Sequence, residues 1–271
     1  MKKQHCIWKI LLSLTLLITI SSCKKEPINS TVRTDSLRPG NSSQPLITRY
    51  EYAVNVYTLF GYNHAGQVAA VTDINDIARS DYTITYKKNG KVDRINLGNG
   101  YWKFNYNKNN LLAKADAYTY TNGNAVSHGY YQFVYSGQKV IQFLSYSDYG
   151  TNVIEPRSKI DLQYDAYGDI TRSDAYLWDI TEGKYHSSGY QLYQNDTHPN
   201  PVYPFRDIFM VLYHVVGPHN FTKAESFDAY GYVDQNNVFE FTYDSLGYPV
   251  AAVRRNLAAG PNGFVTLKFV Y

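Results

Sequence analysis

The sequence predicts an all-β protein, in which serial antiparallel hairpins form a twisted meander sheet, open or partly closed, with one short helical insertion near residues 204–216. Two observations favour this fold class. Apolar and polar residues alternate with a period of two along many segments, and one turn motif recurs between those segments. A proline-framed apolar segment that breaks the alternation predicts the insertion.

The N-terminus is typical of an export signal that ends at a lipid-attachment site. Three lysines precede an apolar run over residues 10–20, which is too short to span a bilayer but suits a signal peptide. The sequence Ile-Ser-Ser-Cys follows and resembles the bacterial lipobox, in which the cysteine, here Cys23, becomes the lipidated first residue. We expect a signal peptide over residues 1–22 and a protein anchored to a membrane, although an ordinary signal peptide with a chance cysteine is the alternative.

The positive charge of the chain belongs to this leader. The sequence has 26 basic and 23 acidic residues, and residues 1–22 contain three lysines and no acids, which leaves 23 of each. A balanced mature chain has no bulk charge with which to seek phosphate backbones, so nucleic acid is not an expected partner. Cys6 leaves with the leader and Cys23 is the lipid site, so no disulfide is expected, and no cofactor is expected either.

Residues 23–47 are predicted to be a lipidated flexible tether, because Ser, Thr, Pro and Asn dominate and few large apolar residues are present. A single domain of hairpin repeats is expected over residues 48–271. Within the tether, the sequence Asp-Ser-Leu resembles the O-glycosylation sequon of Bacteroidota, which makes Ser36 a candidate modified residue.

An aromatic residue followed four positions later by glycine or asparagine recurs through the domain. The pairs are Tyr62 and Gly66, Tyr86 and Gly90, Tyr106 and Asn110, Tyr164 and Gly168, Phe227 and Gly231, and Tyr243 and Gly247. The next residue is Asp or Asn in every unit except one, where it is Lys87. Asp or Asn before Gly in this spacing is typical of a type I turn. Asp165 and Asp228, in the two copies of Asp-Ala-Tyr-Gly, are therefore predicted to be turn residues and not catalytic acids.

Strands are predicted on both sides of each turn. Ile160, Leu162 and Tyr164 alternate with polar residues, as a strand with one buried face requires. An apolar residue returns after each turn to open the partner strand, and about seven such hairpins are expected. In the last hairpin Pro249 takes this place, which predicts an edge strand or a bulge.

The insertion is expected to be a short helix that covers part of the sheet. Pro204 suits a first helical position, Gly217 suits the position after the last turn, and Pro218 follows. A buried strand is the alternative, because the segment is apolar on nearly every side.

The motifs Tyr-Asp-Ala-Tyr-Gly at 164–168 and Tyr-Asp-Ser-Leu-Gly at 243–247 resemble the tyrosine-aspartate (YD) hairpin repeats of Rhs-type proteins. With the lipobox, the tether and the segments NDTHPNPVYPF and GPHNFTK, the wider pattern resembles uncharacterised Bacteroidota lipoproteins of unknown function. The resemblance implies an all-β, lipid-anchored outer-membrane protein that faces the periplasm or the cell surface. About seven units are too few for the closed cage of Rhs-type proteins.

Candidate residues for chemistry are sparse. His198, His214 and His219 lie near the insertion, but the last two are five residues apart across Gly217, which is not the spacing of a helical zinc pair. We therefore expect no metal site and no catalytic residue. Four acids are candidates for a glycosidase-like carboxylate pair and are equally well explained as exposed strand residues: Asp161, Asp174, Asp179 and Glu182.

Tyrosine is abundant, at 28 of 271 residues, and most copies suit core or cross-strand positions. Tyr118, Tyr120 and Tyr176 fall on second strands or near hairpin tips and are candidates for ligand stacking. The expected function is thus a non-catalytic binding or scaffolding module that contacts a glycan or an envelope protein. An envelope hydrolase and a purely structural subunit are the alternatives.

Overall fold

The computed structural model of the chain describes residues 45–53, 55–75, 77–148, 150, 153–213, 215–259 and 264–271. The strands are β1 (Arg49–Ala53), β2 (Val56–Tyr62), β3 (Val68–Ile74), β4 (Arg79–Tyr86), β5 (Val92–Leu97), β6 (Gly100–Tyr106), β7 (Leu112–Thr121), β8 (Asn124–Ser136), β9 (Lys139–Ser147), β10 (Glu155–Tyr164), β11 (Ile170–Asp179), β12 (Lys184–Pro199), β13 (His219–Asp228), β14 (Val233–Tyr243), β15 (Pro249–Asn256) and β16 (Phe264–Val270).

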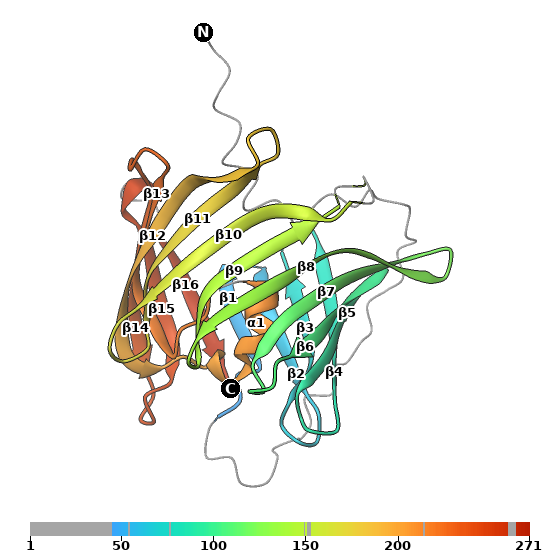
Figure 1. Cartoon of the computed structure of the whole chain (residues 1–271). Coiled ribbons are helices and arrows are strands. Elements are labelled where there is room, and N and C mark those ends of the chain that lie inside the picture. Colours follow the sequence, from blue (N-terminus) through green and yellow to red (C-terminus); the bar gives the residue numbers. More distant parts are fainter. Residues whose placement is uncertain are drawn as a thin grey trace. The chain divides into compact units, whose positions relative to one another are not determined.

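These sixteen strands form one closed antiparallel barrel, in which each strand pairs with its neighbours along the chain (Figure 1). β1 and β16 complete the ring, with Tyr50 opposite Phe269 and Glu51 opposite Lys268. The all-β class and the serial hairpins are confirmed. The expectation of an open or partly closed sheet is wrong.

Bulges beside the repeat aromatics give the physical reason for closure. The pairing shifts immediately before Tyr62, Tyr86, Tyr106, Tyr135, Tyr164, Phe227 and Tyr243. In the hairpin of β10 and β11, for example, Gln163 pairs with Arg172 and Tyr164 pairs with Ile170, so Thr171 is the extra residue. A bulge bends its strand and increases the local twist, and a sheet that curls far enough loses both edges. Of the two alternatives predicted at Pro249, the bulge is present, since the shift before Tyr243 faces it, and the edge strand is wrong, since β15 pairs with both β14 and β16.

Antiparallel order places alternate turns at opposite ends of the barrel. The repeat end carries the turns at 63–67, 87–91, 107–111, 165–169 and 244–248 and the insertion between β12 and β13. The distal end carries the turns at 75–78, 98–99, 122–123, 180–183 and 229–232. The two copies of Asp-Ala-Tyr-Gly follow β10 and β13, three strands apart, and therefore lie at opposite ends.

The insertion forms a 3₁₀-helix, Tyr203–Phe205, followed by the helix α1 (Arg206–Leu212), which lies inside the ring of strands (Figure 1). The predicted helix is confirmed, and the buried-strand alternative is wrong. The helix ends earlier than expected, because Tyr213 and not a residue beside Gly217 is its C-terminal cap. The Tyr213 hydroxyl donates to Asp73 Oδ2 at 2.7 Å, which fixes this end of the helix to β3.

The core of the domain fills the lumen of the barrel around α1. Residues 208–211 of the helix are all buried, and they form one apolar cluster with inward side chains such as Ile95 and Phe104, both fully buried. The Phe209 ring lies 5.9 Å from the ring of Phe60 on β2. Ile47, the last residue of the expected tether, also belongs to this core and is 1% exposed.

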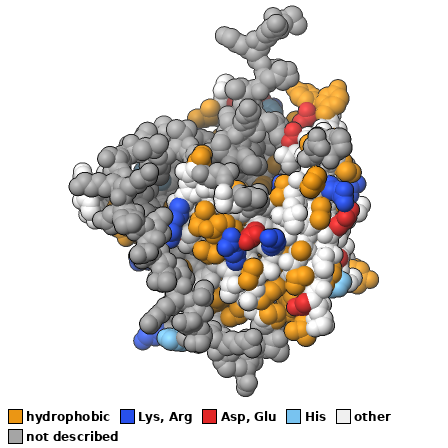
Figure 2. All heavy atoms as spheres, turned by 180° about the vertical axis from the view of Figure 1, so that it is seen from behind, with side chains coloured by type: hydrophobic (Ala, Val, Ile, Leu, Met, Phe, Trp, Pro, Cys, Tyr) orange, Lys and Arg blue, Asp and Glu red, His pale blue; other side chains and the backbone are white. Residues whose placement is uncertain are grey.

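The outer face of the barrel is charged. Lys114 and Asp116 flank Ala115, which is fully buried in the core, so both side chains leave the opposite face of β7. The same basic and acidic pairing, with contacts of 2.6 to 2.9 Å, occurs at Arg49 and Glu51, Arg79 and Asp81, Lys114 and Asp116, Lys159 and Asp161, Arg172 and Asp174, and Lys223 and Glu225. Figure 2 shows acidic side chains lying between basic ones on the back of the molecule.

Candidate functional site

The repeat tyrosines bind neighbouring hairpins together at the repeat end. Tyr86 donates its hydroxyl hydrogen to the Val68 carbonyl at 2.7 Å, and Tyr164 donates to the Val140 carbonyl at 2.6 Å. We name the series of such residues the tyrosine ladder: Tyr62 to Ile47, Tyr86 to Val68, Tyr135 to Leu112, Tyr164 to Val140 and Tyr271 to Pro249. Burial raises the pKa of Tyr164 to about 12, so these phenols are neutral donors.

The Asp or Asn that follows each repeat aromatic caps its turn. Asp165 Oδ1 accepts the backbone N–H groups of Tyr167 and Asp169, both at 2.9 Å. The same pair of bonds is made by Asn63, Asn107, Asp228 and Asp244. The prediction that Asp165 and Asp228 are turn residues is therefore confirmed. Lys87, the exception, instead donates its ammonium to the Phe104 carbonyl at 2.9 Å.

The histidines near the insertion form contacts at the ends of β12 and β13, where the chain leaves and re-enters the barrel. His219 Nδ1 lies 2.7 Å from Asp169 Oδ2. The His198 ring stacks on Tyr243 with centroids 3.8 Å apart, and the Tyr243 hydroxyl donates to Asp196. These contacts join β12, β13 and the neighbouring turns, which is a structural role. His214 lies outside the described residues.

The acids weighed as a catalytic pair fall into two places. Asp161 and Asp174 are opposite each other on β10 and β11, and each is paired on the outer face with its own cation, Lys159 or Arg172. They lie on a convex, charged wall of the barrel and not in a cleft. Asp179 and Glu182 lie elsewhere, at the distal hairpin between β11 and β12.

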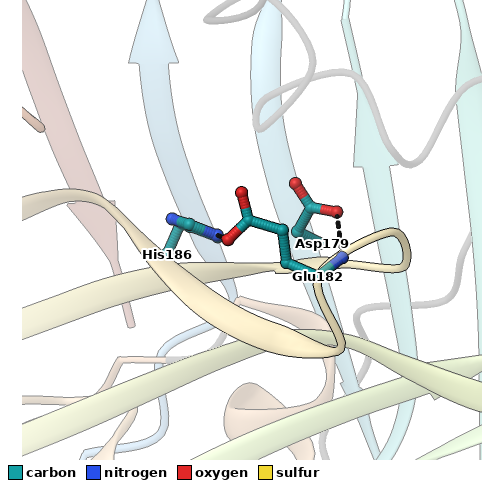
Figure 3. Close-up of side chains that lie close together, drawn as sticks. All are labelled: Asp179, Glu182 and His186. Atoms are coloured by element: carbon teal, nitrogen blue, oxygen red, sulfur yellow. Dashed lines mark hydrogen bonds and ion pairs between the residues drawn. The ribbon is translucent and has the colours of Figure 1, made fainter.

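Asp179 and Glu182 meet His186 at that hairpin, and the possible ligand atoms of the three residues all lie within 4.8 Å of one another (Figure 3). Existing partners already use these groups. Asp179 Oδ1 accepts the Glu182 backbone N–H at 3.0 Å, and Glu182 Oε2 contacts His186 Nε2 at 3.1 Å and the Lys184 ammonium at 2.6 Å. Both acids are candidates from the sequence, whereas His186 was not predicted to join them.

The candidate stacking tyrosines do not form one surface. Tyr118 and Tyr120 lie on β7, whereas Tyr176 lies on β11, four strands away. Tyr118 stacks on Tyr101 with centroids 4.8 Å apart, and the Lys159 ammonium covers Tyr176 at 4.1 Å. Tyr120 is 49% exposed and is the most accessible of the three. The faces of Tyr118 and Tyr176 are therefore partly occupied by their own neighbours.

The outer face carries a pattern that was not predicted from the sequence. A basic residue, an acidic residue and an aromatic residue occupy alternate positions of one strand, and all three leave the outer face. The copies are Lys114, Asp116 and Tyr118; Arg172, Asp174 and Tyr176; and Lys223, Glu225 and Phe227. The spacing of two residues was a detectable signal, because it places these side chains on one face of a strand. Its role is to build ion pairs and cross-strand ring stacks.

A pocket of about 430 Å³ opens at the repeat end between two hairpin turns and the start of α1. We name it the mouth pocket, and its lining is Gly66, Gln67, Tyr86, Gly90, Lys91, Val92 and residues 203–208. Gln67 Nε2 donates to the Gly90 carbonyl at 3.1 Å, which joins the two turns into one wall. Val92 and Ile208 are buried and form an apolar base.

The polar groups of the mouth pocket are mainly cationic. Arg206 is half-buried, donates to the Tyr203 hydroxyl at 3.1 Å, and has its Nε 3.9 Å from Asp207. The Lys91 ammonium lies 5.4 Å from the centre of the Tyr106 ring and, among the described residues, has no carboxylate within 4.0 Å. Two cations therefore share this pocket with one carboxylate. These residues were not predicted from the sequence, because three separate segments of the chain contribute them.

Cys23 and Ser36, the expected lipid and glycan attachment sites, lie outside the described residues. So do the expected signal peptide and nearly all of the expected tether. Within the part of the chain that the structure describes, no helix has the length and apolar character needed to cross a membrane.

Comparison with known proteins establishes the fold and no more. No family model matches the sequence, and no curated protein matches it. A porin-like protein from Bacteroides uniformis is similar in structure, with a TM-score of 0.54 and 14% identity, over 82% of this chain and 94% of that one. A porin-like protein from Bacteroides vulgatus has a TM-score of 0.55 and 11% identity, over 84% of this chain and 99% of that one. The chain shares the barrel fold of these two proteins.

Proposed function

We propose that this protein is a lipid-anchored barrel of the bacterial envelope that works outside the lipid as a non-conducting binding or scaffolding module. The observation that carries the proposal is the distribution of side chains across the wall of the barrel. The lumen is packed around α1 and is mainly apolar, and the outer face carries ion pairs on β1, β4, β7, β10, β11 and β13.

This distribution is the reverse of that in a membrane-spanning barrel. Such barrels present an apolar band to the lipid and enclose a polar, often water-filled interior. A charged residue on the lipid face costs about 2–4 kcal/mol at the bilayer midplane for Lys or Arg. Lys159 and Lys223 would meet lipid in the middle of β10 and β13, so the outer face favours water as its surroundings. The packed lumen likewise disfavours conduction of solutes.

The envelope location and the anchor are supported by the sequence. The export signal and the lipobox-like segment that ends at Cys23 support lipidation there, and the resemblance to Bacteroidota lipoproteins supports the outer membrane. The tyrosine ladder supports the proposed relation to YD-repeat hairpins, since it explains why tyrosine and aspartate recur together. Whether the barrel faces the periplasm or the cell surface is a question for protease accessibility on intact cells.

A protein partner is favoured over a glycan by the distal end of the barrel. Large apolar side chains are exposed on several distal turns, among them Ile77 at 91%, Tyr230 at 85% and Ile180 at 66%. Tyr230, Tyr232 and Val233 are neighbours at the distal turn between β13 and β14, and contiguous exposed apolar groups are typical of interaction surfaces. Glycan binding remains a proposal for the exposed Tyr120. The hydrolase alternative has less support, because the mouth pocket is lined by one carboxylate where glycosidases require two.

The decisive experiment compares the native protein with a Cys23→Ala variant. We expect the native protein to incorporate labelled palmitate and to require detergent, and the variant to remain folded in buffer without detergent. Reconstituted into planar bilayers, the native protein should give no single-channel steps, whereas a trimeric porin serves as the positive control. Discrete conductance steps, or a Cys23→Ala barrel that still partitions into membranes, would contradict the proposal.

Ser36 is proposed as an O-glycosylated residue on the strength of its Asp-Ser-Leu sequence. The intact mass of the protein from its native host should fall by the mass of a glycan in a Ser36→Ala variant. The Asp244-Ser-Leu copy caps a turn in the barrel and provides the internal comparison. If the native protein and the Ser36→Ala variant have equal masses after correction for the substitution, the proposal of glycosylation at Ser36 is wrong.

A further inference from the structure

We propose that the mouth pocket at the repeat end binds a small organic carboxylate. The inference deepens the proposed binding role and names a ligand class and the residues that select it. It is separate from the stacking tyrosines and from the distal surface, which lie on other parts of the barrel.

The pocket is built from parts that are held in place. Gln67 links the turn of β2 and β3 to the turn of β4 and β5, and its own Oε1 accepts Asn63 Nδ2 at 3.0 Å. Tyr86 is fixed through its bond to the Val68 carbonyl. Gly90 has a φ of +80°, so the backbone there turns close to the pocket without a side chain. A site with fixed walls loses little entropy when a ligand binds.

Its charge selects an anion. The guanidinium of Arg206 has five N–H donors, and one of them is used by the Tyr203 hydroxyl. Its distance of 3.9 Å to Asp207 is that of a loose ion pair and not of a hydrogen bond. Lys91, which also lines the pocket, adds a second cation. Spare Arg donors in a planar fork match the two oxygens of a carboxylate.

The shape of the mouth pocket selects a small ring attached to that carboxylate. Phe205, Pro204 and the ring of Tyr203 line one wall, and Val92 and Ile208 close the base. The volume of about 430 Å³ lies within the range of small-molecule sites. Asp207 is the single acceptor of the lining that carries a charge, and the Tyr106 hydroxyl interacts with it. A sugar acid and an aromatic acid both satisfy these requirements, so the common chemistry is a carboxylate on a ring.

The experiment is calorimetric titration of the whole protein with two matched pairs of probes. D-glucuronate is compared with D-glucose, and benzoate with benzyl alcohol, so that each pair differs mainly in charge. We expect at least one acid to bind at a single site and to bind about ten-fold more tightly than its neutral partner. The pair of probes in which the acid binds identifies the ring of the ligand as a sugar or an aromatic ring.

Variants locate the site. Arg206→Gln and Lys91→Gln should each weaken the acid by about ten-fold, because each removes a charged donor. Lys88→Gln, an exposed lysine of the same turn that does not line the pocket, should leave the affinity unchanged. If Arg206→Gln lowers the melting temperature, Lys91→Gln and Arg206→Lys carry the test, since both keep the packing of α1.

Two results would overturn the inference: no saturable heat from either acid at millimolar concentration, or an affinity that Lys91→Gln leaves unchanged. Neither result bears on the anchored, non-conducting role, which the bilayer recordings test. Conductance steps in a protein that still binds glucuronate or benzoate would refute the non-conducting role and would not contradict the carboxylate site in the mouth pocket.

Discussion

At the scale of single residues, the recurrence of tyrosine and aspartate has a mechanical explanation. The aspartate caps its own turn with two backbone bonds, and the tyrosine reaches to a carbonyl of the preceding hairpin. The aspartate stabilises the turn of its own hairpin, and the tyrosine bonds that hairpin to the preceding one. This explains why Asn serves as well as Asp at the first position, whereas a catalytic carboxylate has no such substitute.

The tyrosine ladder predicts the effect of removing one hydroxyl. Tyr164→Phe should lower the free energy of unfolding by about 1 kcal/mol, because the Val140 carbonyl loses its donor inside the barrel. Tyr167→Phe, three residues away and 85% exposed, is the matched control and should be neutral. Urea denaturation measures both. Equal stability of the two variants would mean that the ladder contributes nothing.

The turn caps predict a contrast between two substitutions at one position. Asp165→Ala should lower the free energy of unfolding by about 1 kcal/mol, since two backbone N–H groups lose their acceptor. Asp165→Asn should be close to neutral, because Asn63 and Asn107 already cap sister turns through the same oxygen. Thermal unfolding of both variants tests this. A large loss in Asp165→Asn would show that the charge matters there.

At the scale of elements, the hairpins and the helix differ in how much of their structure could be predicted from the sequence. The hairpins were predictable, since period-two alternation and the turn motif are local signals. The helix was predictable as a helix, but its location inside the barrel was not. A short apolar segment is compatible with any buried surface, and the residues it packs against, such as Phe60 and Ile95, are far away in the sequence.

The helix is predicted to be part of the cooperative core. Phe209→Ala should lower the free energy of unfolding by about 3–5 kcal/mol, because the side chain is 6% exposed and packs against Phe60. Leu246→Ala, on a repeat-end turn and 66% exposed, is the control and should change little. Chemical denaturation followed by Trp102 and Trp178 fluorescence reports on the strands. If Phe209→Ala leaves their transition unmoved, α1 folds independently of the barrel.

At the scale of the whole molecule, the barrel buries many phenols around one lumen. Burial raises the pKa of Tyr131 and Tyr193 to about 12, from an ordinary value of 10.0. The unfolded chain therefore releases these protons at lower pH than the folded chain does. Stability from these groups is fully present below about pH 10 and falls as the pH rises toward about 12.

Alkaline titration tests this prediction. The urea midpoint should fall between about pH 10 and about pH 12, and the loss should coincide with a cooperative rise in tyrosinate absorbance. The Tyr131→Phe variant, which cannot ionise at that position, should show a smaller decrease than the native protein. A midpoint that is independent of pH across this range would contradict the assignment of buried, neutral tyrosines.

The sequence by itself determined the all-β class, the hairpins, their turns and the helix, because each of these depends on residues close together in the chain. Closure into a barrel, the location of α1 in the lumen and the mouth pocket were decided by the tertiary structure. Closure requires Tyr50 to meet Phe269, and the pocket requires Gln67, Lys91 and Arg206 to converge. Twist accumulates strand by strand, and each bulge adds to it. No local sequence pattern therefore predicts whether the first and last of sixteen strands will pair.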